Sequence, residues 1–249
     1  MDLFAHFDRV YVINLATRVD RRRETLAEMA RHATAGSIEE KVEFFAAKTS
    51  DVADGFSSPN MRACFLSHLA VLRSVEAAGW ERVLVLEDDV VFEDRARELM
   101  AALGPEILAG EYDLAQLGYI DVHGHAAELG VSGPALVPFD GEVLGAQCVV
   151  YTAAGAARVR AHFERLLTGT RHHPLRGPMP PDGALNVLPW VDSDARRLIA
   201  VPCLADQRPS RSDITPSWLD RAPVTRAVAA GLRRSTTIRS LRRRTASAT

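Results

Sequence analysis

The chain has 249 residues, of which 47% are hydrophobic and 25% charged, a composition typical of a globular protein with one large domain or two small ones. Fibrous and low-complexity classes are excluded, and the net charge of −2 argues against a dedicated nucleic-acid-binding protein. Cys64, Cys148 and Cys203 form no C-x-x-C pair, so we expect free thiols in a reducing compartment. No signal-peptide pattern is present, and no stretch reaches the roughly 18 apolar residues of a membrane span, so we expect a cytoplasmic protein.

Apolar runs and helical periodicity alternate along the first two-thirds of the chain. Strands are predicted at residues 9–15, 42–46, 83–86, 112–117, 143–151 and 198–202, and helices at residues 21–32, 61–78, 95–103, 153–167 and 184–188. Gly79 and the pair Gly104-Pro105 are expected to end the second and third helices, and residues 168–183 to form a loop. This alternation predicts an α/β domain over residues 1–220, with a mostly parallel central sheet flanked by helices.

The strongest chemical signal is the segment VLVLEDDVVF, residues 83–92. Glu87, Asp88 and Asp89 directly follow an apolar strand of the kind that is buried on both faces of a parallel sheet. Ligands of open α/β sheets bind outside the carboxyl ends of the strands, and a cation would relieve the repulsion between three adjacent carboxylates. Oxygen ligands suit Mn²⁺ or Mg²⁺, which often bridge to phosphates. The alternative interpretation is a solvated acidic turn.

Two classes of protein place acidic residues at a strand end in this way. In the receiver domain of a response regulator, an acidic pair near the N-terminus holds Mg²⁺, and a lysine well downstream contacts the phosphoryl group. Here the acidic run begins at Glu87, and the only lysines, Lys41 and Lys48, precede it, which excludes a receiver domain. In glycosyltransferases of the GT-A type, a D-x-D-like strand end holds a metal that neutralises the diphosphate of a nucleotide sugar.

Further motifs accompany the acidic segment. INL is followed by R-x-D-R-R (residues 13–22), a predicted helix carries C-x-x-S-H-L (residues 64–69), and the acidic segment reads LEDDV (residues 86–90). GAQCVVYTAAGAA (residues 145–157), Asp182 in PPDG and a Q…SDI ending (residues 207–214) complete the pattern. Over roughly residues 9–215 the chain resembles glycosyltransferase family 25, which includes bacterial lipooligosaccharide galactosyltransferases and collagen galactosyltransferases.

The resemblance implies a GT-A-like fold, inversion at the anomeric carbon and often UDP-galactose as the donor. It implies transfer of a hexose, galactose favoured, from a UDP-sugar to a hydroxyl of a glycan or lipid-linked saccharide, in lipopolysaccharide, lipooligosaccharide or other cell-surface polysaccharide biosynthesis. At residues 147–149 the family more often has a small residue and an aromatic, which leaves the sugar open.

Two other functions are alternatives to this transferase. A non-catalytic relative that binds a nucleotide sugar or a glycan stays open as the alternative. A Mg²⁺-dependent phosphoryl-transfer domain is disfavoured, because the sequence has neither a Gly-rich phosphate loop nor a lysine downstream of the acidic segment.

Inverting transfer needs a cation at the leaving diphosphate and a carboxylate that takes the proton of the acceptor hydroxyl. Given the resemblance, we predict that Asp89 and Glu87 bind Mn²⁺ or Mg²⁺, because alternate strand residues share a side. Glu87 and Asp88 are predicted to contact the ribose or the metal. Asp182, in a loop that could close over a sugar, is the predicted general base, and Asp213 is the second candidate. An ordinary turn residue is the alternative for Asp182.

The remaining candidates precede the acidic segment. Asn14 and Arg18 follow the first predicted strand, where the base and ribose of the donor would lie; the alternatives are a turn cap and a solvated side chain. Ser67 and His68 lie within the second predicted helix, where His68 could hydrogen-bond the diphosphate, orient a carboxylate or be an ordinary core residue. Two histidine pairs lack a cysteine or glutamate at ligand spacing and are not predicted to bind metal: His123/His125 and His172/His173.

Residues 221–249 contain eight arginines and no acidic residue, so the near-neutral total hides an acidic main domain and a basic tail. A short amphipathic helix followed by disordered residues is predicted there. One interpretation is docking on anionic lipids, at roughly 1 kcal/mol for each basic residue near the surface, which would hold the protein at the inner face of the membrane beside a lipid-linked acceptor. The other is a solvated tail in a chain that uses arginine far more than lysine.

Overall fold

The computed structural model describes residues 2–123, 131–169 and 178–208. The chain divides into two compact units, Met1–Gln207 and Arg208–Thr249, and every element below belongs to the first. Asp213, His125, the pair at 172–173 and the basic tail lie outside the described residues. Among the helices that are described, none combines the length and the apolar character needed to span a membrane.

The strands of the described residues are β1 (Arg9–Asn14), β2 (Val42–Ala46), β3 (Arg82–Glu87), β4 (Val90–Phe92), β5 (Leu114–Gly118), β6 (Asp121–His123), β7 (Ala135–Pro138), β8 (Glu142–Leu144), β9 (Cys148–Thr152), β10 (Arg197–Val201) and β11 (Ala205–Gln207). The central sheet has the spatial order β2-β1-β3-β9-β5-β10-β7. Within it β1, β2, β3, β5 and β10 are parallel, and β9 and β7 are antiparallel to them. Beside it β4 pairs with β11, and β6 and β8 form a separate two-stranded sheet.

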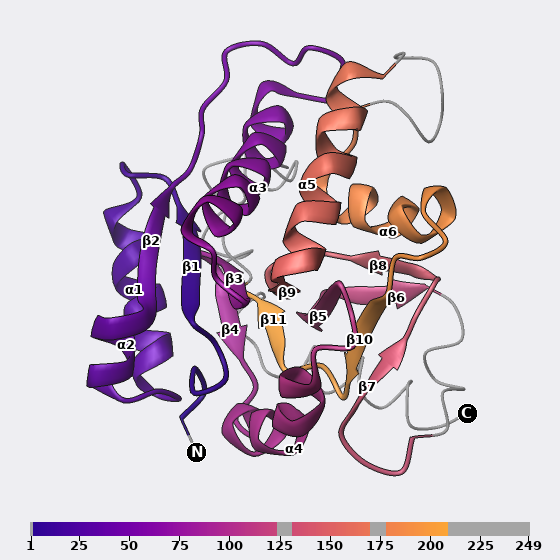
Figure 1. Ribbon diagram of the computed structural model, residues 1–249. Coiled ribbons are helices and arrows are strands. Elements are labelled where there is room, and N and C mark those ends of the chain that lie inside the picture. The colour runs from indigo at the N-terminus through magenta and orange to yellow at the C-terminus, as the bar shows by residue number, and fades with distance from the viewer. Residues whose placement is uncertain (1, 124–130, 170–177, 209–249) are drawn as a thin grey trace, which may run out of the picture. The chain divides into compact units, whose positions relative to one another are not determined.

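The helices of the described residues are α1 (Val19–Ala30), α2 (Ala35–Lys41), α3 (Pro59–Ala78), α4 (Ala96–Ala109), α5 (Ala153–Thr168) and α6 (Pro181–Val191). Met29 of α1 and Leu103 of α4 belong to one apolar cluster, and Phe65 of α3, Phe163 of α5 and Leu185 of α6 belong to another. Alternate residues of β3 divide between the two clusters, so helices cover both faces of the sheet. Figure 1 shows α3 and α5 side by side, with α6 next to α5. The predicted α/β fold, with a mostly parallel sheet between helices, is confirmed.

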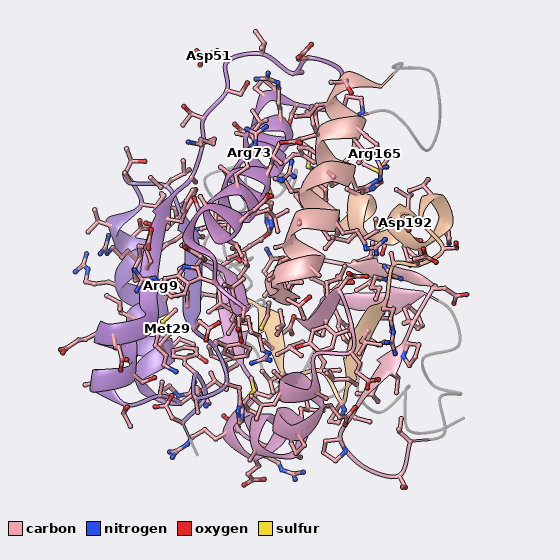
Figure 2. All side chains as sticks on the ribbon, in the orientation of Figure 1. Arg9, Met29, Asp51, Arg73, Arg165 and Asp192 are labelled. Atoms are coloured by element: carbon pink, nitrogen blue, oxygen red, sulfur yellow. The ribbon has the colours of Figure 1, made fainter. Side chains whose placement is uncertain are left out.

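Helix α3, which carries two of the candidate residues, ends at Gly79 as predicted. The Ser58 hydroxyl accepts a hydrogen bond from the backbone N–H of Met61 at 3.1 Å and caps the N-terminus. Gly79 ends the helix with a φ of 71°, a conformation that glycine adopts readily. On the outer side of the helix, Arg73, labelled in Figure 2, pairs with Glu164 of α5 at 2.9 Å.

The predicted end of the third helix at Gly104-Pro105 is wrong, since α4 continues to Ala109. Gly104 lies against the ring of His6, where a β-carbon would collide. Ile107, beyond the proline, is fully buried. Close packing therefore explains the glycine, and burial of the last turn outweighs the backbone hydrogen bond that the proline removes.

Two further predictions are corrected near the candidate site. The single strand predicted over residues 143–151 is two strands, β8 and β9, because Gly145 turns the chain with a φ of 96°. The predicted loop over residues 168–183 includes a helix start, since α6 begins at Pro181 and places Asp182 in its first turn. Proline suits the first helical position, where no backbone donor is needed, and a carboxylate there interacts favourably with the helix dipole.

Candidate active site

Strand β3 is a central strand and ends at Glu87, so the acidic segment lies at the end of the sheet where the parallel strands finish. Asp88 and Asp89 form a turn before β4. Leu86 lies opposite Cys148 of β9, and both belong to the apolar cluster that contains α1 and α4. Because successive strand residues point to opposite faces, Glu87 points to the face that α3, α5 and α6 cover. The strand ends before Asp89, so the alternation expected to place Asp89 beside Glu87 does not extend that far.

Asp88 is held inside the protein on the α1 side. Its Oδ2 accepts a hydrogen bond from Asn14 Nδ2 at 2.7 Å, and its Oδ1 accepts one from Arg21 Nη1 at 2.8 Å. Its backbone carbonyl accepts a hydrogen bond from the Thr25 hydroxyl at 2.6 Å. Asp88 is only 7% exposed. The side chains of Asp88 and Asn14, both predicted to contact the donor, thus hydrogen-bond each other inside the protein.

Asp89 is equally buried, at 6% exposure, but only part of its carboxylate has a partner. Oδ2 accepts a hydrogen bond from Gln207 Nε2 at 3.0 Å and lies 3.6 Å from Arg21 Nη1. No partner for Oδ1 is found among the described residues. Burial, together with the charges of Glu87 and Asp88, raises the pKa of Asp89 to about 7 against the pull of Arg21. A buried carboxylate oxygen of this kind suits a cation, and the oxygen ligands fit Mn²⁺ or Mg²⁺.

The position of Gln207 follows from strand pairing. Strand β11 pairs antiparallel with β4, and Gln207 lies opposite Val90, the residue after Asp89. The glutamine that begins the Q…SDI pattern is therefore brought to the acidic segment from the far end of the folded unit.

Glu87 lies against helix α3. Its Oε1 is 3.1 Å from Nε2 of His68, which is 2% exposed. Cys64, one helical turn earlier, lies on the same side of α3. Ligand atoms of Cys64, His68 and Glu87 all lie within 4.8 Å of one another, so these three residues together could also hold a metal ion. The sequence analysis predicts only a free thiol at Cys64, although the spacing of four residues between Cys64 and His68 places both on one side of a helix.

Asp182 joins the same group from α6. Its Oδ2 accepts a hydrogen bond from the backbone N–H of Gly145 at 2.9 Å, and its Oδ1 accepts one from the next residue's N–H at 2.8 Å. Burial and the charges of Glu87, Asp182 and Asp89 raise the pKa of the Cys64 thiol well above its usual range. The predicted base and the predicted metal ligands therefore lie in one cluster, which we call the acidic cluster: Glu87, Asp89 and Asp182.

Two buried glutamines beside the acidic cluster were missed as site residues. Gln147 precedes β9, and its backbone carbonyl accepts a hydrogen bond from the N–H of Glu87 at 3.1 Å. Gln116 of β5 donates from Nε2 to the carbonyl of Gly145 at 3.1 Å. In the sequence, only the departure from the family pattern at residues 147–149 drew attention to this region. The two glutamines are 31 positions apart, and no sequence motif predicts that they lie together.

The other two predicted donor-binding residues, Arg18 and Ser67, form their hydrogen bonds and ion pairs with residues outside the acidic cluster. Arg18 pairs with Asp20 at 2.9 Å. The Ser67 hydroxyl donates to the carbonyl of Ala63 at 2.7 Å and accepts from the N–H of Lys48 at 2.8 Å, which anchors the segment after β2 to α3.

Comparisons with known proteins support the resemblance to glycosyltransferase family 25. Residues 7–125 match the model of Glycosyltransferase family 25 (LPS biosynthesis protein). Inactive glycosyltransferase 25 family member 3 of Homo sapiens is 34% identical over 129 residues, which cover 45% of this chain and 22% of that protein. Procollagen galactosyltransferase 2 of Mus musculus is 33% identical over 122 residues, which cover 43% of this chain and 20% of that protein.

The matched part corresponds to about a fifth of the length of these relatives. The family match includes the INL, C-x-x-S-H-L and LEDDV motifs, and thereby Asn14, His68 and the three carboxylates of the acidic segment. The predicted resemblance is confirmed: residues 7–125 match the model of glycosyltransferase family 25.

Proposed function

We propose that this protein is a metal-dependent inverting glycosyltransferase. It would move a hexose, galactose favoured, from a UDP-sugar to a hydroxyl of a glycan or lipid-linked saccharide, in cell-surface polysaccharide or lipooligosaccharide biosynthesis. The observation that carries the proposal is the buried Asp89 Oδ1, which has no partner among the described residues and belongs to a cluster with Glu87 and Asp182. The match to family 25 supports a glycosyl transfer, and the name of the mouse relative supports galactose.

Asp89 and Glu87 are the proposed ligands of Mn²⁺ or Mg²⁺. Gln207 and Arg21 hold Asp89 Oδ2, which leaves Oδ1 for the ion. When bound, such a cation stabilises the negative charge that develops on the diphosphate leaving group. His68 orients Glu87 from α3, since its ring nitrogen lies 3.1 Å from Glu87 Oε1.

Asp182 is the proposed general base. In an inverting transfer, the acceptor oxygen forms a bond to the anomeric carbon as the bond from that carbon to the diphosphate breaks, and the hydroxyl proton passes to a carboxylate. Two backbone N–H groups hold the Asp182 carboxylate in place, and each of its oxygens retains a lone pair for the proton. The first turn of α6 therefore presents a fixed proton acceptor beside the metal ligands.

A non-catalytic relative that binds a nucleotide sugar is the second candidate. The observation that favours it is the name of the human relative, which calls that protein inactive. The two candidates predict different outcomes in one experiment.

The experiment screens UDP-hexoses with Mn²⁺ in the wild type, Asp89→Asn and Asp182→Asn, and follows thermal stability, donor hydrolysis and transfer. Asp94→Asn is the matched control, because Asp94 is 92% exposed and forms a surface ion pair with Arg31. We expect both cluster variants to lose at least about 100-fold in kcat/KM, and Asp89→Asn alone to lose the stabilisation by Mn²⁺. Full transfer by Asp89→Asn would overturn the metal assignment, and donor binding without turnover on every acceptor would favour the non-catalytic relative.

We further propose that the protein works at the cytoplasmic face of a membrane, with residues 221–249 docked on anionic lipids. The eight arginines of this segment support the proposal, because basic residues near a charged surface gain free energy from it. Deletion of residues 221–249 should lower binding to vesicles that contain anionic lipid and leave binding to neutral vesicles unchanged. Equal binding by the full and shortened chains would contradict this docking.

A further inference from the structure

Two buried amide side chains next to the acidic cluster carry polar atoms that have no hydrogen-bond partner among the described residues. Gln147 is 1% exposed, and neither its Oε1 nor its Nε2 has a partner among the described residues. Gln116 is 0% exposed, and its Oε1 is likewise unpartnered, although its Nε2 donates to Gly145. Buried polar groups in folded proteins are nearly always satisfied. Two neighbouring exceptions therefore need a common explanation.

Both glutamines converge on Gly145. The Gly145 carbonyl accepts a hydrogen bond from Gln116, its N–H donates to Asp182, and a β-carbon on this residue would collide with Oε1 of Gln147. The amide of Gln147 therefore lies against the same glycine that holds the proposed base.

Strand register places Gln147 beside Glu87 as well. Leu86 and Cys148 are directly opposite each other, so the next pair outward is Glu87 and Gln147. Opposite residues of an antiparallel pair point to the same face, which here is the face of α3 and α6. Gln116 lies opposite Val149, a residue of that same face. Gln147 is thus next to a proposed metal ligand, Glu87, and its amide lies against the glycine that holds the proposed base, Asp182.

We propose that Gln147, with Gln116 beside it, determines sugar specificity by binding hydroxyl groups of the transferred hexose. The inference rests on the proposed function. A hydroxyl group is both a donor and an acceptor, which matches an amide whose N–H and C=O are both free. The transferred hexose must lie between the groups that hold the diphosphate and the group that takes the proton. Gln147 adjoins both, since its backbone contacts Glu87 and its amide lies against the glycine that holds Asp182.

The test compares the wild type with Gln147→Met, which has a similar shape and no amide. Donor binding is measured without acceptor, as the rise in Tm caused by UDP and by UDP-hexoses, including donors that lack one hydroxyl. We expect UDP to stabilise both proteins equally, the extra stabilisation by the hexose to disappear in Gln147→Met, and kcat/KM for transfer to fall about 10–100-fold. The wild type should discriminate against one deoxy donor, and the variant should not.

A second expected result is independent of activity. Because the variant removes an unsatisfied buried amide, its free form should melt a few degrees higher than the wild type. Should Gln147→Met be too unstable to purify, Gln147→Asn, which withdraws the amide by one methylene, takes its place in the donor comparison and should also lose the hexose increment.

Three outcomes would overturn the inference. If UDP and UDP-hexoses stabilise the wild type equally, or the hexose increment survives in the variants, the hexose does not contact Gln147 and only this inference fails. If the variants lose only affinity for the acceptor, the amide binds the acceptor instead of the donor sugar. If neither UDP nor any UDP-hexose stabilises the wild type with Mn²⁺, the proposed function fails together with the inference.

Discussion

Asp88 and Asp89 are adjacent and equally buried, yet their surroundings differ. Asp88 lies in what we call the closed cluster, with Asn14, Arg21 and Thr25, where both of its carboxylate oxygens and its backbone carbonyl accept hydrogen bonds. Asp89 belongs to the acidic cluster, and its Oδ1 has no partner among the described residues, as is also true of both amide atoms of Gln147. A fully hydrogen-bonded carboxylate is what support of the fold requires, whereas a buried carboxylate oxygen without a partner needs an explanation, for which we propose a ligand.

The largest effect should come from breaking the closed cluster. Asp88→Ala removes the closest carboxylate from Arg21, which is 9% exposed, and also the nearer of two acceptors from the amide of Asn14. Loss of one member of a buried ion pair typically destabilises a protein by about 3–5 kcal/mol. Urea unfolding should show this loss, whereas Asp94→Ala, at an exposed ion pair, should unfold like the wild type. A small effect of Asp88→Ala would show that the closed cluster does not support the fold.

Substitution of the adjacent residue, Asp89, should raise the free energy of unfolding at high pH instead of lowering it. The pKa of Asp89 is raised to about 7, so the folded protein keeps this proton to a higher pH than the unfolded chain does. The stability that the proton confers is present below the unfolded pKa and is lost as the pH rises through about 7. Asp89→Asn avoids that loss, and at pH 8 without divalent cations it should be more stable than the wild type by on the order of 1–3 kcal/mol.

Measurement at several pH values shows whether the stability gain of Asp89→Asn comes from the titration of Asp89 or from a change that does not depend on pH. The advantage of Asp89→Asn should shrink as the pH falls from 8 to 5, because the wild-type carboxyl becomes protonated in the folded state. Urea unfolding in the presence of a chelator at each pH measures the difference. An advantage that does not change with pH would contradict the assignment of the raised pKa to Asp89.

The smallest effect concerns the backbone of the closed cluster. The Thr25 hydroxyl lies 2.6 Å from the carbonyl of Asp88 and 2.8 Å from that of Arg21, and Thr25 is fully buried. Thr25→Val keeps the shape and leaves a buried carbonyl without its donor, which should destabilise the protein by about 1 kcal/mol. Thr168→Val, at an exposed hydroxyl that contacts a helix carbonyl in the same way, is the control and should have no measurable effect.

The parts of the fold that the sequence predicted were those with strong local signals. Apolar β-branched runs identified β1, β2 and β3, and a glycine ended α3 as expected. The helix end at Gly104-Pro105 could not be recognised as wrong, because the reason for the glycine is a contact with His6, about one hundred positions away in the chain. The helix α2 and the strands β7 and β11 were not predicted, since they are short and their pairing is not local.

The site was predicted unevenly for the same reason. The LEDDV motif identified the acidic segment, and PPDG identified Asp182, although in a loop and not in the first turn of α6. Neither motif could reveal that Asp88 and Asp89 differ, because the difference depends on Arg21, Asn14 and Gln207, which come from other elements. The proposed role of Gln147 depends on strand register and on the positive φ of Gly145, and a short sequence motif predicts neither.

The turn at Gly145 has a practical consequence for redesign. One residue presents its N–H to Asp182, its carbonyl to Gln116 and its bare α-carbon to Gln147. A side chain at this position would displace both the proposed base, Asp182, and the proposed recognition pair, Gln116 and Gln147. A mutant library aimed at a new donor should therefore keep residue 145 constant and vary positions 116 and 147, so that selectivity can change while the chemistry of transfer is retained.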